Sequence, residues 1–179
     1  LKQSNIDVNI QDDEGFTALS LSAYAGYTEI VELLLQHPNI DVNIQDNCGI
    51  TALSISAHSG CTEIVKLLLQ HPNTDVNIED EDKVTALLNA VFNNHIEITK
   101  LLLKHPNINL NYQDKEGYTA LILASLNGYT TIFQLLLNQP DIDVNIKDVN
   151  GYTALIHAIK KNSIEIVKIL LKYSKIDVN

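Results

Sequence analysis

Residues 37–46 read HPNIDVNIQD, and close copies of this stretch begin at residues 71, 105 and 139, each 34 residues after the last. A string that keeps His, Asp and Asn at fixed places is open to two interpretations, a chemical site or a boundary between structural units. The regular spacing favours a boundary, because self-similarity at a period of about 20–50 residues is typical of stacked repeat architectures.

A second motif has the same period. The tripeptide Thr-Ala-Leu begins at Thr17, Thr51, Thr85, Thr119 and Thr153. It lies within D-x-x-G-x-T-A-L, which is followed by small and apolar residues and usually by G-x-T-E-I-V-x-L-L-L. We expect residues 1–179 to form one domain, with units at 12–45, 46–79, 80–113, 114–147 and 148–179, the last nearly complete. Residues 1–11 align with the end of a further unit, so we expect the chain to be part of a longer array.

Each unit carries the signals of two short helices. Thr17 stands where the N-cap of a first helix belongs, because its hydroxyl can accept a hydrogen bond from an early backbone N–H. Gly26 ends this helix with the positive φ that helix C-termini favour. Thr28 is expected to cap a second helix, in which Ile30, Leu33 and their apolar neighbours form a broad stripe. A stripe this broad predicts a helix packed between two neighbours.

The opening stretch is then interpreted as the connection between units. His37 follows the second helix, where a partly positive imidazole suits the carbonyl end of the helix dipole, and Pro38 cannot continue the helix. The alternation in IDVNI predicts a short extended strand. Asp46 and Gly49 are typical of the first and last positions of a tight turn. HPNIDVNIQD is therefore predicted to hold a helix end, a strand and a turn.

A metal site and a catalytic site are both disfavoured. His37, His71 and His105 occupy the same position of successive units, and packed helices lie about 8–10 Å apart. The ligands of one zinc ion must all lie within about 2.0–2.1 Å of it. No hydrolase, metalloprotease or nucleotide-binding motif occurs. The sequence thus predicts no catalytic residue, no metal and no cofactor, and the scattered residues His58, His95 and His157 are interpreted as exposed or hydrogen-bonded.

Composition and charge disfavour several classes of partner. No apolar run approaches the roughly 18 residues of a membrane span, which predicts no membrane insertion. Residues 1–90 carry three Lys and 14 acidic residues, a net charge of −11, whereas residues 91–179 carry nine Lys and eight acids, a net charge of +1. Nucleic-acid binding needs clustered Lys and Arg, so no nucleic-acid partner is expected. Two cysteines without a pairing pattern, Cys48 and Cys61, favour a reducing intracellular compartment, the cytoplasm first.

The combined pattern resembles that of the ankyrin repeat. The matching residues are the D-x-x-G-x-T-A-L motif (12–19), Gly26, and EIVELLL (29–35) followed by DVN (41–43). The resemblance covers essentially the whole chain and implies an all-α solenoid of antiparallel helix pairs joined by extended loops or β-hairpins. Two departures stand out. The family's T-P-L-H appears here without its His, which commonly ties neighbouring repeats together, and G-A-D-V-N becomes the longer P-N-I-D-V-N. The hydrogen bonds between repeats are therefore left open.

The resemblance also implies a binding scaffold whose concave face is formed by hairpin tips and first helices. The hairpin tips supply Asp13, Glu14, Cys48, Glu81 and Asp82; an apolar column beside them consists of Phe16, Ile50, Val84, Tyr118 and Tyr152; and the first helices supply Tyr24, His58, Phe92, Leu126, Lys160 and Lys161. The apolar column is interpreted either as packing between hairpins or as a contact stripe, because aromatic residues are enriched at interface hot spots.

The predicted function is a non-catalytic protein–protein interaction scaffold. A groove edged by acids and floored by apolar groups suits a basic, partly extended segment of a protein partner. The Lys-rich last unit would repel that segment and set its direction. The alternative for the acids is a solvated face that keeps the array in solution. A regulatory or substrate-recruiting segment of a larger enzyme or channel is the second hypothesis, and a mechanical spacer, disfavoured by the apolar column, is the third.

Two further expectations concern stability. In the third unit, Lys83 and Asn94 stand where most other units have Gly, and four consecutive acids (79–82) precede Lys83. We therefore expect an altered hairpin or faster amide exchange in that unit. No polar capping unit is visible at either end, which predicts end-to-end self-association of the chain.

Overall fold

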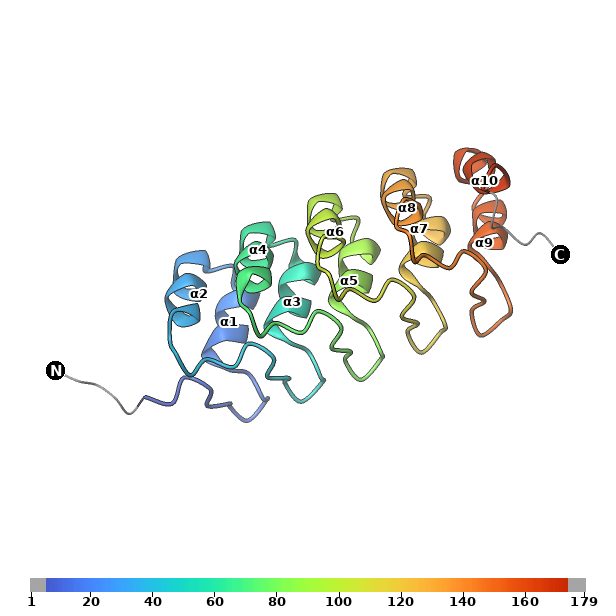
Figure 1. The fold of residues 1–179 in the computed structure, drawn as a ribbon. Coiled ribbons are helices and arrows are strands. Elements are labelled where there is room, and N and C mark those ends of the chain that lie inside the picture. Colours follow the sequence, from blue (N-terminus) through green and yellow to red (C-terminus); the bar gives the residue numbers. More distant parts are fainter. Residues whose placement is uncertain (1–5, 174–179) are drawn as a thin grey trace.

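The protein is a single row of paired helices (Figure 1). A computed structural model describes residues 6–173 and contains ten α-helices within them. The first helices of the pairs are α1 (Ala18–Tyr24), α3 (Ala52–Ser59), α5 (Ala86–Phe92), α7 (Ala120–Asn127) and α9 (Ala154–Lys160). The second helices are α2 (Thr28–Leu35), α4 (Thr62–Gln70), α6 (Ile96–Leu102), α8 (Thr130–Leu137) and α10 (Ile164–Leu171). The described residues contain no β-strand, so the predicted all-α solenoid is confirmed.

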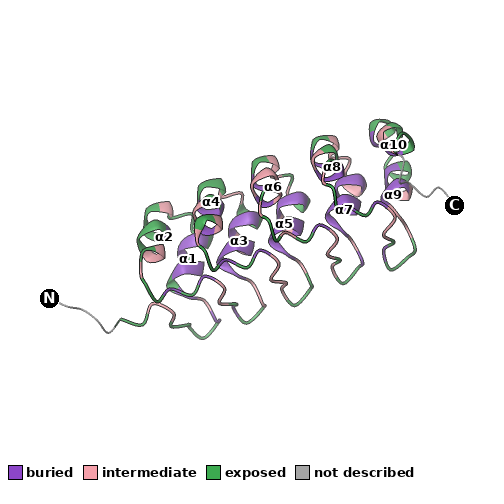
Figure 2. Cartoon of the chain, viewed as in Figure 1, coloured by how far each residue is buried: buried purple, intermediate pink, exposed green. Residues whose placement is uncertain are grey.

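The first helices form the buried layer of the array. Each packs against the first helix of the next pair, and Figure 2 shows them mostly buried while the second helices keep an exposed outer side. One position of every first helix holds a small buried side chain: Ser22, Ser56, Ala90, Ala124 and Ala158. Small residues let neighbouring helices approach closely without leaving voids. The Ser22 and Ser56 hydroxyls donate to helix carbonyls four residues earlier, at 2.7 and 2.6 Å, so neither is left unsatisfied.

The ends of the first helix pair agree with the caps predicted from the sequence, with one exception. Thr17 accepts a hydrogen bond at 3.1 Å from a backbone N–H in the first turn of α1, as predicted, and Gly26 adopts a φ of 74°. The prediction that Thr28 caps α2 is wrong, because Tyr27 is the N-cap residue, without a side-chain bond, and Thr28 is already helical. The N–H groups of Tyr27 and Thr28 instead donate to the carbonyls of Ser22 and Gly26, at 2.9 and 3.0 Å. The tight turn at Gly26 therefore satisfies donors that a side-chain cap would otherwise serve.

Each D-x-x-G segment forms a hairpin loop that projects from the helices. In the second unit the N–H of Asp46 donates to the carbonyl of Ile50 at 3.0 Å, and the N–H of Gly49 donates to the carbonyl of Asp46 at 2.9 Å. In the third unit Lys83 adopts a φ of 60° and its N–H donates to the carbonyl of Asp80 at 2.9 Å. Of the two alternatives expected for the third unit, the altered hairpin is wrong, and faster amide exchange stays a prediction. The same turn forms, and Lys83 carries the strain of a positive φ.

The prediction of a strand in IDVNI is also wrong, because asparagine side chains replace the strand pairing. Asn43 donates through Nδ2 to the carbonyl of Asn73 at 2.7 Å and accepts through Oδ1 from the N–H of Asp75 at 2.9 Å. Equivalent pairs of bonds link successive units along the array. We call this set the Asn ladder: Asn9, Asn43, Asn77 and Asn111. It supplies the hydrogen bonds between repeats that the missing family His left open.

Two of the three His residues of the HPN segments support a turn, whereas His71 Nδ1 is buried without a hydrogen-bond partner among the described residues. His37 Nδ1 accepts from the N–H of Asn39 at 3.3 Å, and His105 Nδ1 accepts from the N–H of Asn107 at 3.4 Å. Within residues 6–173, no group of three His, Cys, Asp or Glu side chains is placed to hold a metal ion. None of the helices in this part of the chain combines the length and apolar character that a bilayer crossing requires.

Candidate functional site

The apolar column is fixed by the aspartates that open the hairpin loops. All five members are half-buried: Phe16, Ile50, Val84, Tyr118 and Tyr152. The backbone N–H of each donates at 2.8 Å to the Oδ1 atom of the Asp four residues earlier. Because this bond recurs in every unit, the column residues leave the hairpins at the same angle. The sequence therefore places one apolar side chain per unit at the junction of hairpin and first helix.

The first-helix residues that the sequence singled out differ in exposure. Tyr24 and Phe92 are 64% and 58% exposed, which is high for large apolar side chains. His58, Lys160 and Lys161 are exposed and Leu126 is half-buried. The ammonium group of Lys160 lies 3.4 Å from the centroid of the Tyr152 ring, close enough for a cation–π contact.

The hairpin tips stand in solvent. All five predicted tip residues are exposed: Asp13, Glu14, Cys48, Glu81 and Asp82. Asp82 forms an ion pair with Lys115 of the next hairpin at 3.0 Å, with both side chains more than half exposed. Exposed ion pairs contribute little to stability. The Asp82–Lys115 pair therefore contributes little to the stability of the array.

The structure brings five predicted residues together around a single hollow. A cavity of about 350 Å³ opens between the third and fourth first helices and their hairpins. We call it the concave cavity, and its lining consists of His58, Val84, Leu88, Asn89, Phe92, Asp114, Glu116, Tyr118, Leu123 and Leu126. Five of these residues were predicted from the sequence as contact residues: His58, Val84, Phe92, Tyr118 and Leu126. The other predicted residues lie outside this cavity.

Five lining residues were not among the predicted contact residues, although Glu116 was predicted at a hairpin tip. Asp114 was assigned only to the turn, although its carboxylate also lines the cavity. Glu116 had a visible signal, since it stands at a hairpin tip. Leu88, Asn89 and Leu123 lie in the first turn and a half of their helices, where the sequence pattern predicts core positions. Only the stacking of one unit on the next shows that these positions border a cavity.

The wall of the concave cavity on the α3 side is polar and ordered. Asn89 donates through Nδ2 to Ser54 Oγ at 2.9 Å, which ties α5 to α3. His58 Nδ1 lies 3.2 Å from Asn89 Oδ1 and 3.3 Å from Asn93 Nδ2. His95 Nε2 lies 3.0 Å from the backbone oxygen of His58. These contacts hold His58 and Asn89 in place at the cavity edge.

The electrostatics of the concave cavity are negative. Burial raises the pKa of the Asp114 carboxyl above its ordinary value of 3.8, although the N–H groups of Tyr118 and Glu116 oppose the rise, and the charges of Glu116 and Asp82 add to it. Burial also raises the pKa of the Tyr118 hydroxyl, with further contributions from Asp148, Glu116 and Asp114. Burial is the main cause of both shifts, and the neighbouring carboxylates add to each of them.

The fifth unit differs at the equivalent place. His157 is only 4% exposed, and its Nε2 atom lies 2.8 Å from Asp148 Oδ2. The ring contacts Tyr118 and Tyr152 edge-on, with centroids 5.7 and 5.8 Å apart. His157 Nδ1 is buried without a hydrogen-bond partner among the described residues. The expectation of an exposed or hydrogen-bonded His is thus right for one ring nitrogen only.

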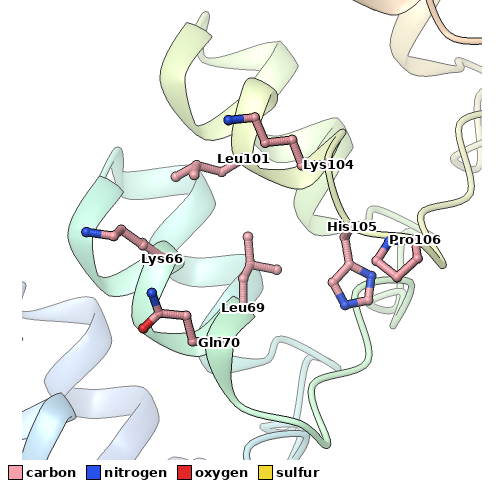
Figure 3. A pocket seen from close by; sticks show the side chains of 7 residues that line it. All are labelled: Lys66, Leu69, Gln70, Leu101, Lys104, His105 and Pro106. Carbon is pink, nitrogen blue, oxygen red and sulfur yellow. The ribbon is translucent and has the colours of Figure 1, made fainter.

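Two other hollows lie between second helices. Figure 3 shows the larger one, of about 390 Å³, lined by Lys66, Leu69, Gln70, Leu101, Lys104, His105 and Pro106. A hollow of about 270 Å³ is lined by the seven residues that lie 34 positions earlier: Glu32, Leu35, Gln36, Leu67, Gln70, His71 and Pro72. Because the same positions line both, these grooves follow from helix stacking. Lys66 is also paired with Glu63 at 3.2 Å. The concave cavity remains the best candidate site.

Comparisons with known proteins agree with this architecture. The family model described as ankyrin repeats, in three copies, matches residues 1–80, 72–148 and 110–179. The crystal structure of EF0377, an ankyrin repeat protein, is similar to this chain with a TM-score of 0.89 and 32% sequence identity, over 96% of this chain and 88% of that one. No curated protein matches this sequence significantly. Since the matches to the family model together span the whole sequence, the chain belongs to the ankyrin repeat family.

Proposed function

We propose that this chain is a non-catalytic protein–protein interaction scaffold, that residues 1–179 act as one array, and that its concave face binds a basic, partly extended segment of a protein partner. Ankyrin repeats generally mediate contacts between proteins. The observation that carries the finer proposal is the concave cavity, where predicted contact residues from three units line an apolar hollow edged by two carboxylates.

The apolar residues of the face supply the binding energy. Phe92 and Tyr24 project from first helices with more than half of their surface in solvent. Covering a large aromatic side chain removes on the order of 150–250 Å² from water. Such anchors dominate the energetics of interfaces and mainly slow dissociation. A partner segment that crosses several first helices would contact both residues.

The acids select the charge of the partner and its direction. The tips of the first and third units carry Asp13, Glu14, Glu81 and Asp82 in solvent. A field of this sign attracts a segment rich in Lys or Arg and raises its association rate. Lys161, in the last unit, is exposed and of opposite sign. A basic segment is therefore expected to lie with its charged part toward the first units.

The test compares two exposed apolar residues on different helix layers. Phe92→Ser alters the proposed face, and Leu33→Ser is the matched control, because Leu33 is 67% exposed on α2. Partners captured from a cell extract with the unmodified chain are purified, and their affinities are measured for each variant. Phe92→Ser is expected to weaken binding by about 2 kcal/mol or more, the range of hot-spot residues, and Leu33→Ser to leave it unchanged.

Charge reversal tests the basic segment separately. Replacing Asp13, Glu14, Glu81 and Asp82 by Lys is expected to lower the affinity and to change its dependence on salt. A partner whose affinity is indifferent both to this reversal and to Phe92→Ser would contradict the proposed function.

A further inference from the structure

The fifth unit shows how this array holds a nitrogen-bearing side chain. His157 lies on Asp148 with its Nε2 atom 2.8 Å from Oδ2, and it contacts the rings of Tyr118 and Tyr152. The Lys160 ammonium covers the Tyr152 ring at 3.4 Å. A carboxylate, an apolar column and two nitrogen-bearing side chains of the same chain thus form one filled cluster.

One unit earlier the same positions are only partly filled. Asp114 corresponds to Asp148, Leu123 to His157 and Leu126 to Lys160, each 34 residues apart. Asp114 Oδ1 accepts the N–H groups of Glu116 and Tyr118, at 3.0 and 2.8 Å. Its Oδ2 atom accepts no hydrogen bond from residues 6–173, and the residue equivalent to His157, Leu123, has no donor. The concave cavity lies at this place.

We propose that the concave cavity binds an arginine side chain of the partner, with the guanidinium group on Asp114 and Glu116. This inference rests on the proposed function and names the anchor residue of that same face. The partner's guanidinium would supply the donors that His157 and Lys160 supply in the next unit, where the chain provides its own.

Arginine fits the lining better than lysine does. Most of the lining is apolar, including Val84, Leu88 and Leu123, which suits the aliphatic stem of a long side chain. The planar guanidinium presents paired N–H donors to a carboxylate and stacks on aromatic rings, and Tyr118 and Phe92 both border the cavity. An ammonium group is a compact, strongly hydrated charge, so it loses more on entering an apolar hollow. The raised pKa of Asp114 agrees with a carboxylate that lacks a cation.

The probe is the amino acid itself with both ends blocked. N-acetyl-arginine-N-methylamide is titrated into the 179-residue chain and followed by nuclear magnetic resonance at the Tyr118 and Phe92 rings. Binding with a dissociation constant on the order of 1 mM is expected for a ligand of this size. The citrulline analogue has a similar planar shape without the positive charge, and the lysine analogue has the positive charge without a planar guanidinium group. Both analogues are expected to bind at least about tenfold more weakly than the arginine probe.

Matched variants locate the binding. Asp114→Asn keeps the Oδ1 acceptor of the turn, and Glu116→Gln alters an exposed side chain; each is expected to weaken arginine binding about tenfold. Asp12→Asn and Glu14→Gln are the same changes three units earlier and are expected to have no effect. Leu126→Lys places an ammonium group where Lys160 stands one unit later and is expected to abolish binding. Tyr24→Lys is its control in the first unit.

The outcomes separate this inference from the proposed function. Equal affinity for arginine and citrulline, or arginine binding that survives both Glu116→Gln and Leu126→Lys in chains with unchanged circular dichroism, would overturn the arginine site. If a purified partner still responds to Phe92→Ser, the scaffold function stands without it. If no partner responds to Phe92→Ser or to the charge reversal, the proposed function fails, whatever the probe shows.

Discussion

The Asn ladder offers a direct measure of how strongly neighbouring units are coupled. Asn77 donates through Nδ2 to the carbonyl of Asn107 at 2.7 Å and accepts through Oδ1 from the N–H of Asn109 at 2.8 Å. Asn77→Ala removes both bonds and leaves one carbonyl and one N–H unpaired. A hydrogen bond contributes a net stabilisation of roughly 0.5–1.5 kcal/mol. Because these two bonds lie near solvent, we expect Asn77→Ala to lower the free energy of unfolding by about 1–2 kcal/mol.

The expected loss is large enough to measure. For a chain of this length, 1 kcal/mol lowers the melting temperature by roughly 2–4 °C, so Asn77→Ala is expected to lower it by about 2–8 °C. Urea unfolding followed by far-ultraviolet circular dichroism gives the free energy. In a stacked array the units are stabilised by their nearest neighbours. A weakened contact in the middle is therefore also expected to broaden the transition, because the two halves unfold less cooperatively.

The control removes an asparagine from the same contact without removing its bond. Asn107 accepts through its backbone carbonyl, which Asn107→Ala retains, and its side chain is exposed. This variant is expected to change the free energy of unfolding by less than about 0.5 kcal/mol. Equal losses for Asn77→Ala and Asn107→Ala would refute the ladder as a source of coupling.

Three further predictions concern strain, acid and the array ends. The amide of Lys83 is expected to exchange faster than that of Gly49, and Lys83→Gly to stabilise the chain by about 1 kcal/mol, because a non-glycine residue is strained at a φ of 60°; equal protection of the two hairpins in hydrogen exchange would contradict this. Burial alone would raise the pKa of Asp148, but the hydrogen bonds from Tyr152, His157 and Asn150 outweigh it and lower the pKa below 3.8. The stability that ionised Asp148 provides is thus present above its unfolded pKa and lost as the pH falls through the lower folded one, so urea titrations should show a smaller acid loss for Asp148→Asn than for the unmodified chain. Concentrated chain is expected to self-associate through its end units, since Ile30 is 46% exposed where Ile64 one unit later is 1% exposed; strictly monomeric sedimentation, unchanged by Ile30→Lys, would count against it.

The sequence predicts the repeating framework well because its signals are local. The Thr17 cap and the positive φ at Gly26 depend on residues within one turn of each other. The strand expected in IDVNI failed for a different reason. Alternation shows that a segment is extended, but a strand needs a partner backbone. Here the N–H of Asp41 donates instead to the Asn9 side chain 32 residues earlier, and that partner is set by stacking.

The candidate site was predictable in part for the same reason. Phe92 and Tyr118 follow from the period, because the same positions of every unit face the same side. The presence of a hollow at one step of the array depends on how side chains from adjacent units fill the space. Asp114 and Leu123 take part in the hollow only through their place beside the neighbouring unit. A scan of one unit at a time therefore assigns Asp114 to its turn and Leu123 to the core.

The contrast between the fourth and fifth units shows how such an array acquires a site. Their backbones are equivalent, since Asp114 and Asp148 both hold the hairpin through two N–H groups at 2.8–3.0 Å. In the fifth unit His157 then contacts the free carboxylate oxygen, whereas in the fourth the equivalent side chain is Leu123. Exchanging one donor for one leucine leaves the helix, the turn and the column in place and opens a carboxylate to a partner. Stability in this array comes from positions that repeat, so a binding site can arise at the positions that vary from unit to unit.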